Sequence, residues 1–304
     1  MEHNNKKKQQ VSSKETAAIC NVFVIGVDGS EGSHNAVELV VTDFHRRGLD
    51  KTVVVHISNA KKEQEKGIQY HSKTIYNKYS EYLAEHLKKE DYEIIFEERK
   101  ENENVFEQVN EIAVAKDATL LVLGFRGYKG TKNRPDELSK SVTYLVHKPR
   151  IPVLVVKEKT LREYRTAGAF KWLICVESAE SKSFKALTSM LRYIDAEGDF
   201  IHGFTVDMNG NEEVLNNPVK KAFDELMTRN EIRNTEFSVI PKSDDHDVKT
   251  SITKWIEKHL ENENHWIDFI VLGYNPSKYA FNKDASNTTV DILREVNCNV
   301  FFDH

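Results

Sequence analysis

The sequence contains two strand-like segments that end in nearly the same motif. Residues 119–127 read TLLVLGFRG and residues 268–276 read DFIVLGYNP, so that Gly124 and Gly273 are 149 positions apart. The same offset relates two further pairs of strand-like segments, which are residues 24–30 with 173–179 and residues 53–57 with 202–206. Three strands that share one offset indicate an internal repeat. The chain is therefore predicted to contain two copies of one module.

The length and the terminal composition suggest how these copies are arranged. A chain of 304 residues is long enough for two domains that each bury a core. Residues 1–19 are polar and include three consecutive lysines, so they carry too little apolar surface to fold. We therefore predict a disordered tail at 1–19, a first domain at 20–158, a linker at 159–170 and a second domain at 171–304.

Composition argues against several classes of partner. The formal net charge is −5 and charged residues make up 30% of the chain, so no overall basic field favours nucleic acid or an anionic membrane surface. No apolar run approaches the roughly 18 residues of a membrane helix, and the N-terminus lacks the apolar stretch of a secretion signal. The three cysteines lie far apart without a C-x-x-C pair, which is typical of reduced thiols. These features predict a soluble, cytoplasmic protein.

Short β-branched runs alternate with amphipathic stretches along both copies. The expected strands of the first copy are residues 21–28, 52–58, 92–97, 118–123 and 152–156, and its expected helices are residues 33–47, 70–89, 104–116 and a stretch that carries Leu138, Val142, Leu145 and Val146. The expected strands of the second copy are residues 171–176, 200–206, 235–240, 268–272 and 298–302. Apolar strands joined by helices indicate a parallel sheet that is covered on both faces. The predicted fold class is α/β, with two doubly wound modules that each contain a five-stranded parallel sheet flanked by helices.

Two loops of the first copy are expected to face the same crevice. Ligands of an open parallel sheet collect at the carboxyl ends of the strands where the winding direction switches, which here lies between the first and fourth strands. The first strand ends at Asp28 and Ser30, and the fourth ends at Gly124 and Gly127. Glycine allows positive φ or a close approach of the backbone, and consecutive N–H groups can cradle a phosphate. A glycine pair of this spacing is also ordinary turn chemistry, so both interpretations stay open.

Other residues near this crevice suit the same chemistry. Asp28 could accept a hydrogen bond from a ribose hydroxyl or from the exocyclic amine of adenine. Arg126 could add positive charge or form a surface ion pair. Ser139 or Ser141, near the expected start of a helix, could offer a hydroxyl and N-terminal amides to the same anion.

Four segments together resemble the universal stress protein family. They are VIGVDGSEGS at 24–33, VVHIS at 54–58, LVLGFRGY at 121–128, and SVTYLV with IPVLVVK within 141–157. The similarity covers residues 21–157 well and residues 171–304 faintly. It implies an adenine nucleotide alpha-hydrolase-like fold, pairing of modules through their last strands and, in one branch of the family, an ATP or AMP site.

The nucleotide-binding pattern of that branch is only half present. The branch carries G-x-x-G, nine residues, and then glycine with serine or threonine. Gly124 and Gly127 match, but Glu137 follows after nine residues, and Ser141 comes later behind Lys140. Lys140 could replace a lost backbone contact with a charge, or the altered loop could leave the crevice malformed.

The resemblance nevertheless assigns a role to each matching position. Asp28, with Ser30 beside it, would meet adenine or ribose, and Ile57 would flank the base. The phosphates would be held by Gly124, Gly127 and Ser141. The remaining candidates, Arg126 and Lys140, could add positive charge there.

The second copy has lost these loop residues. Residues 177–179 read ESA in place of DGS, and residues 274–276 read YNP in place of the glycine loop. Pro276 lacks an N–H where a phosphate would need one. We predict that the second copy is ligand-free and structural, and that it pairs with the first through the final strands, within one chain or between chains.

No enzyme motif stands out elsewhere. The sequence lacks a P-loop, an H-E-x-x-H pair and a serine elbow. Residues 243–247 read SDDHD, which we interpret as capping residues of the following helix rather than as a metal site. The leading hypothesis is a sensor or adaptor that binds ATP or AMP in the first domain only and is not an enzyme. The alternative is a nucleotide-free scaffold subunit of a larger assembly, such as a cytoskeletal one, with a protein partner or self-association.

Overall fold

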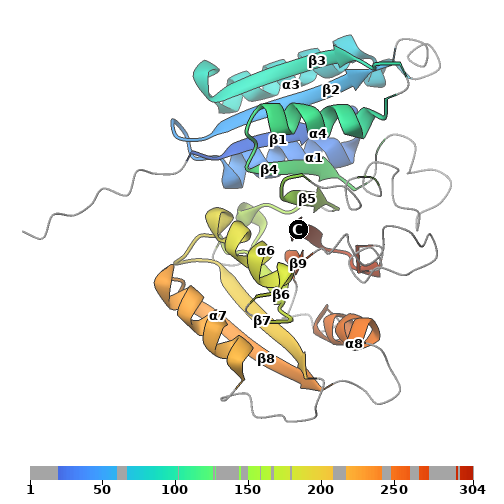
Figure 1. Ribbon diagram of the computed structural model, residues 1–304. Helices are drawn as coiled ribbons and strands as arrows, with labels where there is room; N and C mark the ends of the chain where they lie inside the picture. Colours follow the sequence, from blue (N-terminus) through green and yellow to red (C-terminus); the bar gives the residue numbers. More distant parts are fainter. Residues whose placement is uncertain are drawn as a thin grey trace, which may run out of the picture.

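The computed structural model describes residues 20–59, 67–101, 103–125, 127, 144, 150–157, 159–165, 168–178, 180–207, 217–241, 248–260, 267–273, 292–293 and 295–303. Within these residues, ten strands form one sheet in the order β3-β2-β1-β4-β5-β10-β9-β6-β7-β8 (Figure 1). The strands are β1 (Val22–Gly26), β2 (Lys51–Ser58), β3 (Tyr92–Glu98), β4 (Leu120–Gly124), β5 (Val153–Val156), β6 (Lys171–Cys175), β7 (Phe200–Asp207), β8 (Asn234–Pro241), β9 (Phe269–Gly273) and β10 (Asn299–Asp303).

The strand order repeats about the centre of the sheet. The five strands up to β5, in the N-terminal half, and the five from β6, in the C-terminal half, follow the same order when each half is read from its outer edge inwards. Neighbours within each half are parallel, whereas β5 and β10 are antiparallel, with Val155 opposite Val300 and Val153 opposite Phe302. The pairing of final strands predicted from the sequence therefore occurs within one chain. It turns the two expected five-stranded sheets into one, because the unpaired edge of each half meets the other.

Helices cover both faces of this sheet. One face carries α1 (Glu31–Leu39), α3 (Ser72–His86), α6 (Lys182–Met190) and α7 (Pro218–Arg229), and the other carries α4 (Val105–Ala115) and α8 (Val248–Leu260). The shorter helical segments are η1 (Val40–Phe44), η2 (Ile68–Tyr70), η3 (Lys89–Asp91), η4 (Arg162–Tyr164) and η6 (Leu191–Tyr193). None of the described helices is long and apolar enough to cross a membrane.

The hydrophobic core continues from one half into the other. Phe44 packs against Trp172 and Phe269, with ring centroids 6.3 and 5.9 Å away, and Trp172 stacks on Phe269 at 4.1 Å. The core layer on each face contains buried side chains from both halves. The two predicted domains therefore share their core instead of each burying a separate one, because the sheet is continuous.

The first helix has other bounds than the expected 33–47, and its last turn is not α-helical. It begins at Glu31, because the Ser30 hydroxyl caps it by accepting the Ser33 N–H, and it changes to a π-helical turn at Val40–Phe44. The predicted tail at 1–19 and the acidic segment at 243–247 lie outside the described residues. The predicted helix that carries Leu138, Val142, Leu145 and Val146 also lies outside them, apart from Tyr144.

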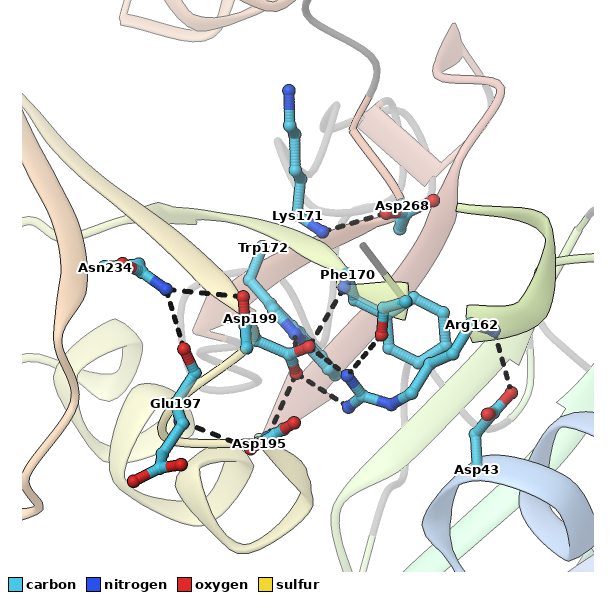
Figure 2. Close-up of polar contacts among 12 residues, drawn as sticks. Asp43, Arg162, Phe170, Lys171, Trp172, Asp195, Glu197, Asp199, Asn234 and Asp268 are labelled. Carbon is cyan, nitrogen blue, oxygen red and sulfur yellow. Dashed lines mark hydrogen bonds and ion pairs between the residues drawn. The ribbon is translucent and has the colours of Figure 1, made fainter. Parts of the chain in front are cut away.

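The connection between the halves is anchored by ion pairs to two buried aspartates, of which Figure 2 shows the pair of Arg162 with Asp199. The Arg162 guanidinium pairs with Asp199, with 2.8 Å between Nη2 and Oδ2, and the Arg162 N–H donates to Asp43 of the N-terminal half at 3.3 Å. Arg165 pairs with Asp268 at 2.6 Å. Both aspartates are buried at the amino ends of strands in the C-terminal half. The predicted linker is thus tied to residues on each side of it.

Buried aspartates at corresponding positions make corresponding backbone contacts in the two halves. Asp50 accepts the backbone N–H groups of Asn21 at 2.7 Å and Arg46 at 3.0 Å. In the other half, 149 positions later in each case, Asp199 accepts the backbone N–H groups of Phe170 at 2.9 Å and of Asp195 at 3.1 Å. The offset predicted from strand-like segments therefore extends to these polar contacts.

Candidate functional site

A pocket lies at the carboxyl ends of β1, β2 and β4. Its volume is about 100 Å³. The first turns of α1 and α4 complete its walls, because a helix that follows a strand begins at this edge of the sheet. The lining residues are Gly26, Val27, Asp28, Ser30, Ser33, Val55, Ile57, Val105, Phe106, Val109, Leu123, Gly124 and Gly127.

The Asp28 carboxylate is held in place by the first turn of α1. Asp28 Oδ1 accepts the Ser30 N–H at 3.0 Å and the Ser30 hydroxyl at 2.5 Å. The Asp28 N–H donates to Ser33 Oγ at 3.4 Å, and Gly29 between these residues has a φ of 83°. Glycine suits this position because other residues rarely adopt positive φ. The Ser30 contacts therefore fix one oxygen of the carboxylate beside the pocket.

The Ser33 hydroxyl joins this loop to α3. Ser33 Oγ donates to the Ser30 carbonyl at 2.9 Å and lies 3.3 Å from the Tyr79 hydroxyl. Burial raises the pKa of Tyr79 to about 12, so its hydroxyl keeps its proton at neutral pH. The contact is therefore a neutral hydrogen bond that supports the pocket wall from behind.

Two glycines allow the end of β4 to lie close to the Asp28 loop and the start of α1. A Cβ on Gly124 would lie 2.4 Å from the carbonyl carbon of Gly32, and a Cβ on Gly127 would lie 2.5 Å from Asp28 Oδ2. Neither residue has positive φ, so of the two roles expected for these glycines the structure shows the close approach. The contact partners are the start of α1 and the Asp28 carboxylate.

The rest of the pocket wall is apolar. Val55 and Ile57 of β2 and Leu123 of β4 come from strands, whereas Val105, Phe106 and Val109 come from α4. The Asn104 side chain caps α4 by accepting the Phe106 N–H at 3.3 Å. An apolar slot beside one fixed carboxylate suits a flat ring that carries a hydrogen-bond donor on its edge.

Five of the eight residues predicted for the site meet at this pocket. They are Asp28, Ser30, Ile57, Gly124 and Gly127. Arg126, Lys140 and Ser141 lie outside the described residues. Sequence reasoning missed Ser33 and the α4 residues. The signal that could have found them is topological, since the helices after β1 and β3 must begin at the carboxyl edge.

The corresponding region of the C-terminal half keeps the framework and changes the side chains. Glu177 N–H donates to Ser183 Oγ at 3.1 Å, as Asp28 does to Ser33, and a Cβ on Gly273 would lie 2.1 Å from the Ser183 nitrogen. Cys175 is buried in place of Gly26, and burial raises the pKa of its thiol to about 12. The Cys175 thiol is therefore packed in the core and keeps its proton at neutral pH. The altered loop at 274–276 lies outside the described residues.

Metal chemistry finds no support among the described residues. No group of three or more His, Cys, Asp or Glu side chains in that part of the chain could hold a metal ion.

Comparisons with known proteins agree on the fold. The model of the universal stress protein family matches residues 21–157. A universal stress protein from Archaeoglobus fulgidus superposes with a TM-score of 0.61 and 16% identity, covering 93% of this chain and 97% of that one. A functionally unknown protein from Pseudomonas aeruginosa superposes with a TM-score of 0.60 and 10% identity, covering 93% and 92%. No curated protein matches the chain. The family match, on a mostly parallel α/β sheet, identifies residues 21–157 as a universal stress protein domain.

Proposed function

We propose that the N-terminal half binds ATP or AMP and that the chain acts as a sensor or adaptor without significant turnover. The observation that carries this proposal is the convergence of Asp28, Ile57 and Gly124 on one pocket, although they come from three separate strand ends. A parallel sheet of this order presents such a crevice at its carboxyl edge. The C-terminal half serves as a structural partner.

Each group in the pocket has a chemical task in this proposal. The Asp28 carboxylate accepts a hydrogen bond from the exocyclic amine of adenine or from a ribose hydroxyl. Ile57 and the apolar α4 residues contact the faces of the base. Gly124 and Gly127 contact the phosphates in this proposal. Arg126, Lys140 and Ser141, which lie outside the described residues, would supply positive charge and hydrogen-bond donors to them.

The pocket size divides the ligand into two parts. A volume of about 100 Å³ is well below the roughly 300–1,000 Å³ of a typical ligand pocket. In this proposal the base fills the described pocket, and the ribose and phosphates extend beyond it past Gly124 and Gly127. Contacts to the base and contacts to the phosphates then contribute separately to the binding free energy.

Calorimetry and thermal unfolding of the full chain with ATP, ADP, AMP and GTP test the proposal. A nucleotide at 100 times its Kd should stabilise the fold by about 2.7 kcal/mol. GTP should bind more weakly than ATP, because guanine presents an oxygen where adenine presents its amine. Asp28→Asn should weaken ATP binding about tenfold, since a charge-assisted hydrogen bond is replaced by a neutral one.

The C-terminal half provides a matched control. Glu177→Gln changes the corresponding carboxylate, which is exposed, and should leave ATP affinity unchanged. Equal loss in both variants, or no response to any nucleotide at millimolar concentration, would contradict the proposal. The second result favours the nucleotide-free scaffold, for which the satisfied Asp28 Oδ1 and the small pocket are the supporting observations.

A further inference from the structure

A buried histidine lies directly behind the candidate pocket. His56 is 4% exposed and sits on β2 between Val55 and Ile57, which line the pocket. Successive side chains of a strand point to opposite faces of the sheet, so its imidazole lies on the α3 face, away from the pocket. There it packs against the Phe96 ring of β3, with centroids 5.0 Å apart. His56 therefore cannot touch a ligand in the pocket.

Both ring nitrogens of His56 have partners. Nδ1 lies 2.8 Å from the Val27 carbonyl and Nε2 lies 3.1 Å from Ser72 Oγ. A carbonyl oxygen only accepts hydrogen bonds, so Nδ1 carries a proton, and in the neutral ring Nε2 accepts from the Ser72 hydroxyl. The geometry thus selects one tautomer of His56. It also links the end of β1 to the first residue of α3.

The residue that His56 holds is the last one before Asp28. The Val27 N–H donates to the Val55 carbonyl at 2.9 Å, and its carbonyl accepts from His56. With both polar groups of Val27 bound to β2, the chain enters the Asp28 loop in a fixed direction. A displaced Val27 would move the Asp28 carboxylate relative to Ile57.

The start of α3 also touches the loop directly. A Cβ on Gly29 would lie 3.1 Å from the Gln69 carbonyl and 3.1 Å from the Ile75 side chain. The segment that leads into α3 therefore packs on the same turn that His56 restrains through Val27. In the C-terminal half, the position that corresponds to His56 holds Thr205, whose side chain is shorter and has one polar atom.

We infer that His56 is a positioning residue of the candidate site, which holds the Val27 carbonyl and thereby sets the place of the Asp28 carboxylate in the pocket. This inference rests on the proposed nucleotide site for its functional meaning, but its geometric content concerns the loop alone. The Nδ1 hydrogen bond is the part that acts on the pocket. The Nε2 contact with Ser72 orients the ring.

Two amide substitutions separate the contacts of His56. In His56→Asn the amide nitrogen can take the place of Nδ1 and donate to Val27, whereas in His56→Gln the amide takes the place of Nε2 and reaches Ser72 instead. His56→Gln should speed hydrogen exchange of the Asp28 and Ser30 amides at least about tenfold and weaken ATP binding by about the same factor, since a hydrogen bond to a buried carbonyl is lost. His56→Asn should retain most of both properties. Ser72→Ala removes the Nε2 partner but leaves the Nδ1 donor, so it should speed loop exchange less than His56→Gln does.

Nitrogen NMR of the histidine rings checks the tautomer without any ligand. Neutral His56 should carry its proton on Nδ1, and a proton on Nε2 alone would overturn the inference. Equal effects of His56→Asn and His56→Gln on loop exchange, or an unchanged loop in His56→Gln, would also overturn it.

The outcome is separable from that of the proposed function. If the unsubstituted chain binds no nucleotide, the proposed function fails while amide exchange and the tautomer still decide the role of His56. If the chain binds ATP and His56→Gln loosens the loop without weakening binding, the nucleotide site stands and the positioning role is wrong.

Discussion

At the scale of single residues, Asp43 carries a titratable group at the contact between the N-terminal half and the connection. Its pKa is raised to about 6, chiefly by burial, although the Arg162 backbone N–H and the Arg162 charge oppose the rise. The nearby carboxylates of Glu163 and Asp199 raise it further. The folded protein therefore binds this proton more tightly than the unfolded chain does. The stabilisation from Asp43 is complete below about pH 4 and is lost as the pH rises through about 6.

Asp43→Asn should remove this pH dependence. The neutral amide keeps an acceptor for the Arg162 N–H and carries no charge that burial would penalise. We expect the variant to melt roughly 2 °C above the unsubstituted protein at pH 7.5, with the difference vanishing near pH 4. Thermal unfolding between pH 4 and 8 measures it. A difference that stays constant across this range would show that Asp43 does not titrate as inferred.

At the scale of elements, the arginine that neutralises a buried aspartate comes from different places in the two halves. Asp50 receives the guanidinium of Arg46, one turn away, with 2.7 Å between Nη2 and Oδ1. The position that corresponds to Arg46 in the C-terminal half is Asp195, and Asp199 receives its guanidinium from Arg162 of η4 (Figure 2). The connection thus supplies a charge that the C-terminal half lacks in its own turn.

Removal of Arg162 should lower the free energy of unfolding, and a second substitution should restore part of it. Arg162→Ala leaves Asp199 buried with N–H partners only, and we expect a loss of about 3 kcal/mol in the free energy of unfolding. Arg233→Ala, which breaks the exposed pair with Glu197, should cost at most about 0.5 kcal/mol. Asp195→Arg in the Arg162→Ala background recreates the Arg46 arrangement and should recover part of the loss. Chemical denaturation of the four proteins tests this, and equal losses for Arg162→Ala and Arg233→Ala would contradict it.

The helix after β1 shows where sequence periodicity stops being informative. Ala36, Val37, Val40 and Phe44 share a helical face in the sequence, and that pattern correctly predicts a helix. It does not reveal the π-helical turn, because a single wide turn leaves the buried positions apolar. The π-helical turn accommodates one extra residue in the N-terminal half relative to the C-terminal half. Ser33 and Ser183, which make matching contacts, are 150 positions apart, whereas the core residues Phe44 and Tyr193 are 149 apart.

At the scale of the whole molecule, the repeat offset predicted two copies of one module, and the alternation of apolar strands with helices predicted the class of fold. The pairing through final strands came from the family resemblance and from the need to cover the sheet edges. Strand ends were sufficient to place Asp28 and Gly124 together, because the carboxyl ends of parallel strands meet at one edge. Ile57 came from the family resemblance instead. The contribution of Arg162 was not predictable, since it depends on tertiary packing between segments far apart in the sequence. The shared core was missed for the same reason.

Pairing within the chain uses the edges that could otherwise join two molecules. The outer strands of the described sheet are β3 and β8, and β3 ends in Glu97 and Glu98, which discourage strand addition. We expect a monomer of about 35 kDa in light scattering coupled to size-exclusion chromatography. A stable 70 kDa species (~twice the chain mass) would show that another surface mediates association.

The opposite directions of β5 and β10 have a consequence for any ligand. The parallel strands of one half run towards one long side of the sheet, and those of the other half run towards the opposite side. A molecule seated beside Asp28 therefore has no shared entrance with the equivalent location next to Glu177. A ligand bound at one edge does not block the other edge. Any communication between the two edges therefore has to pass through the protein itself.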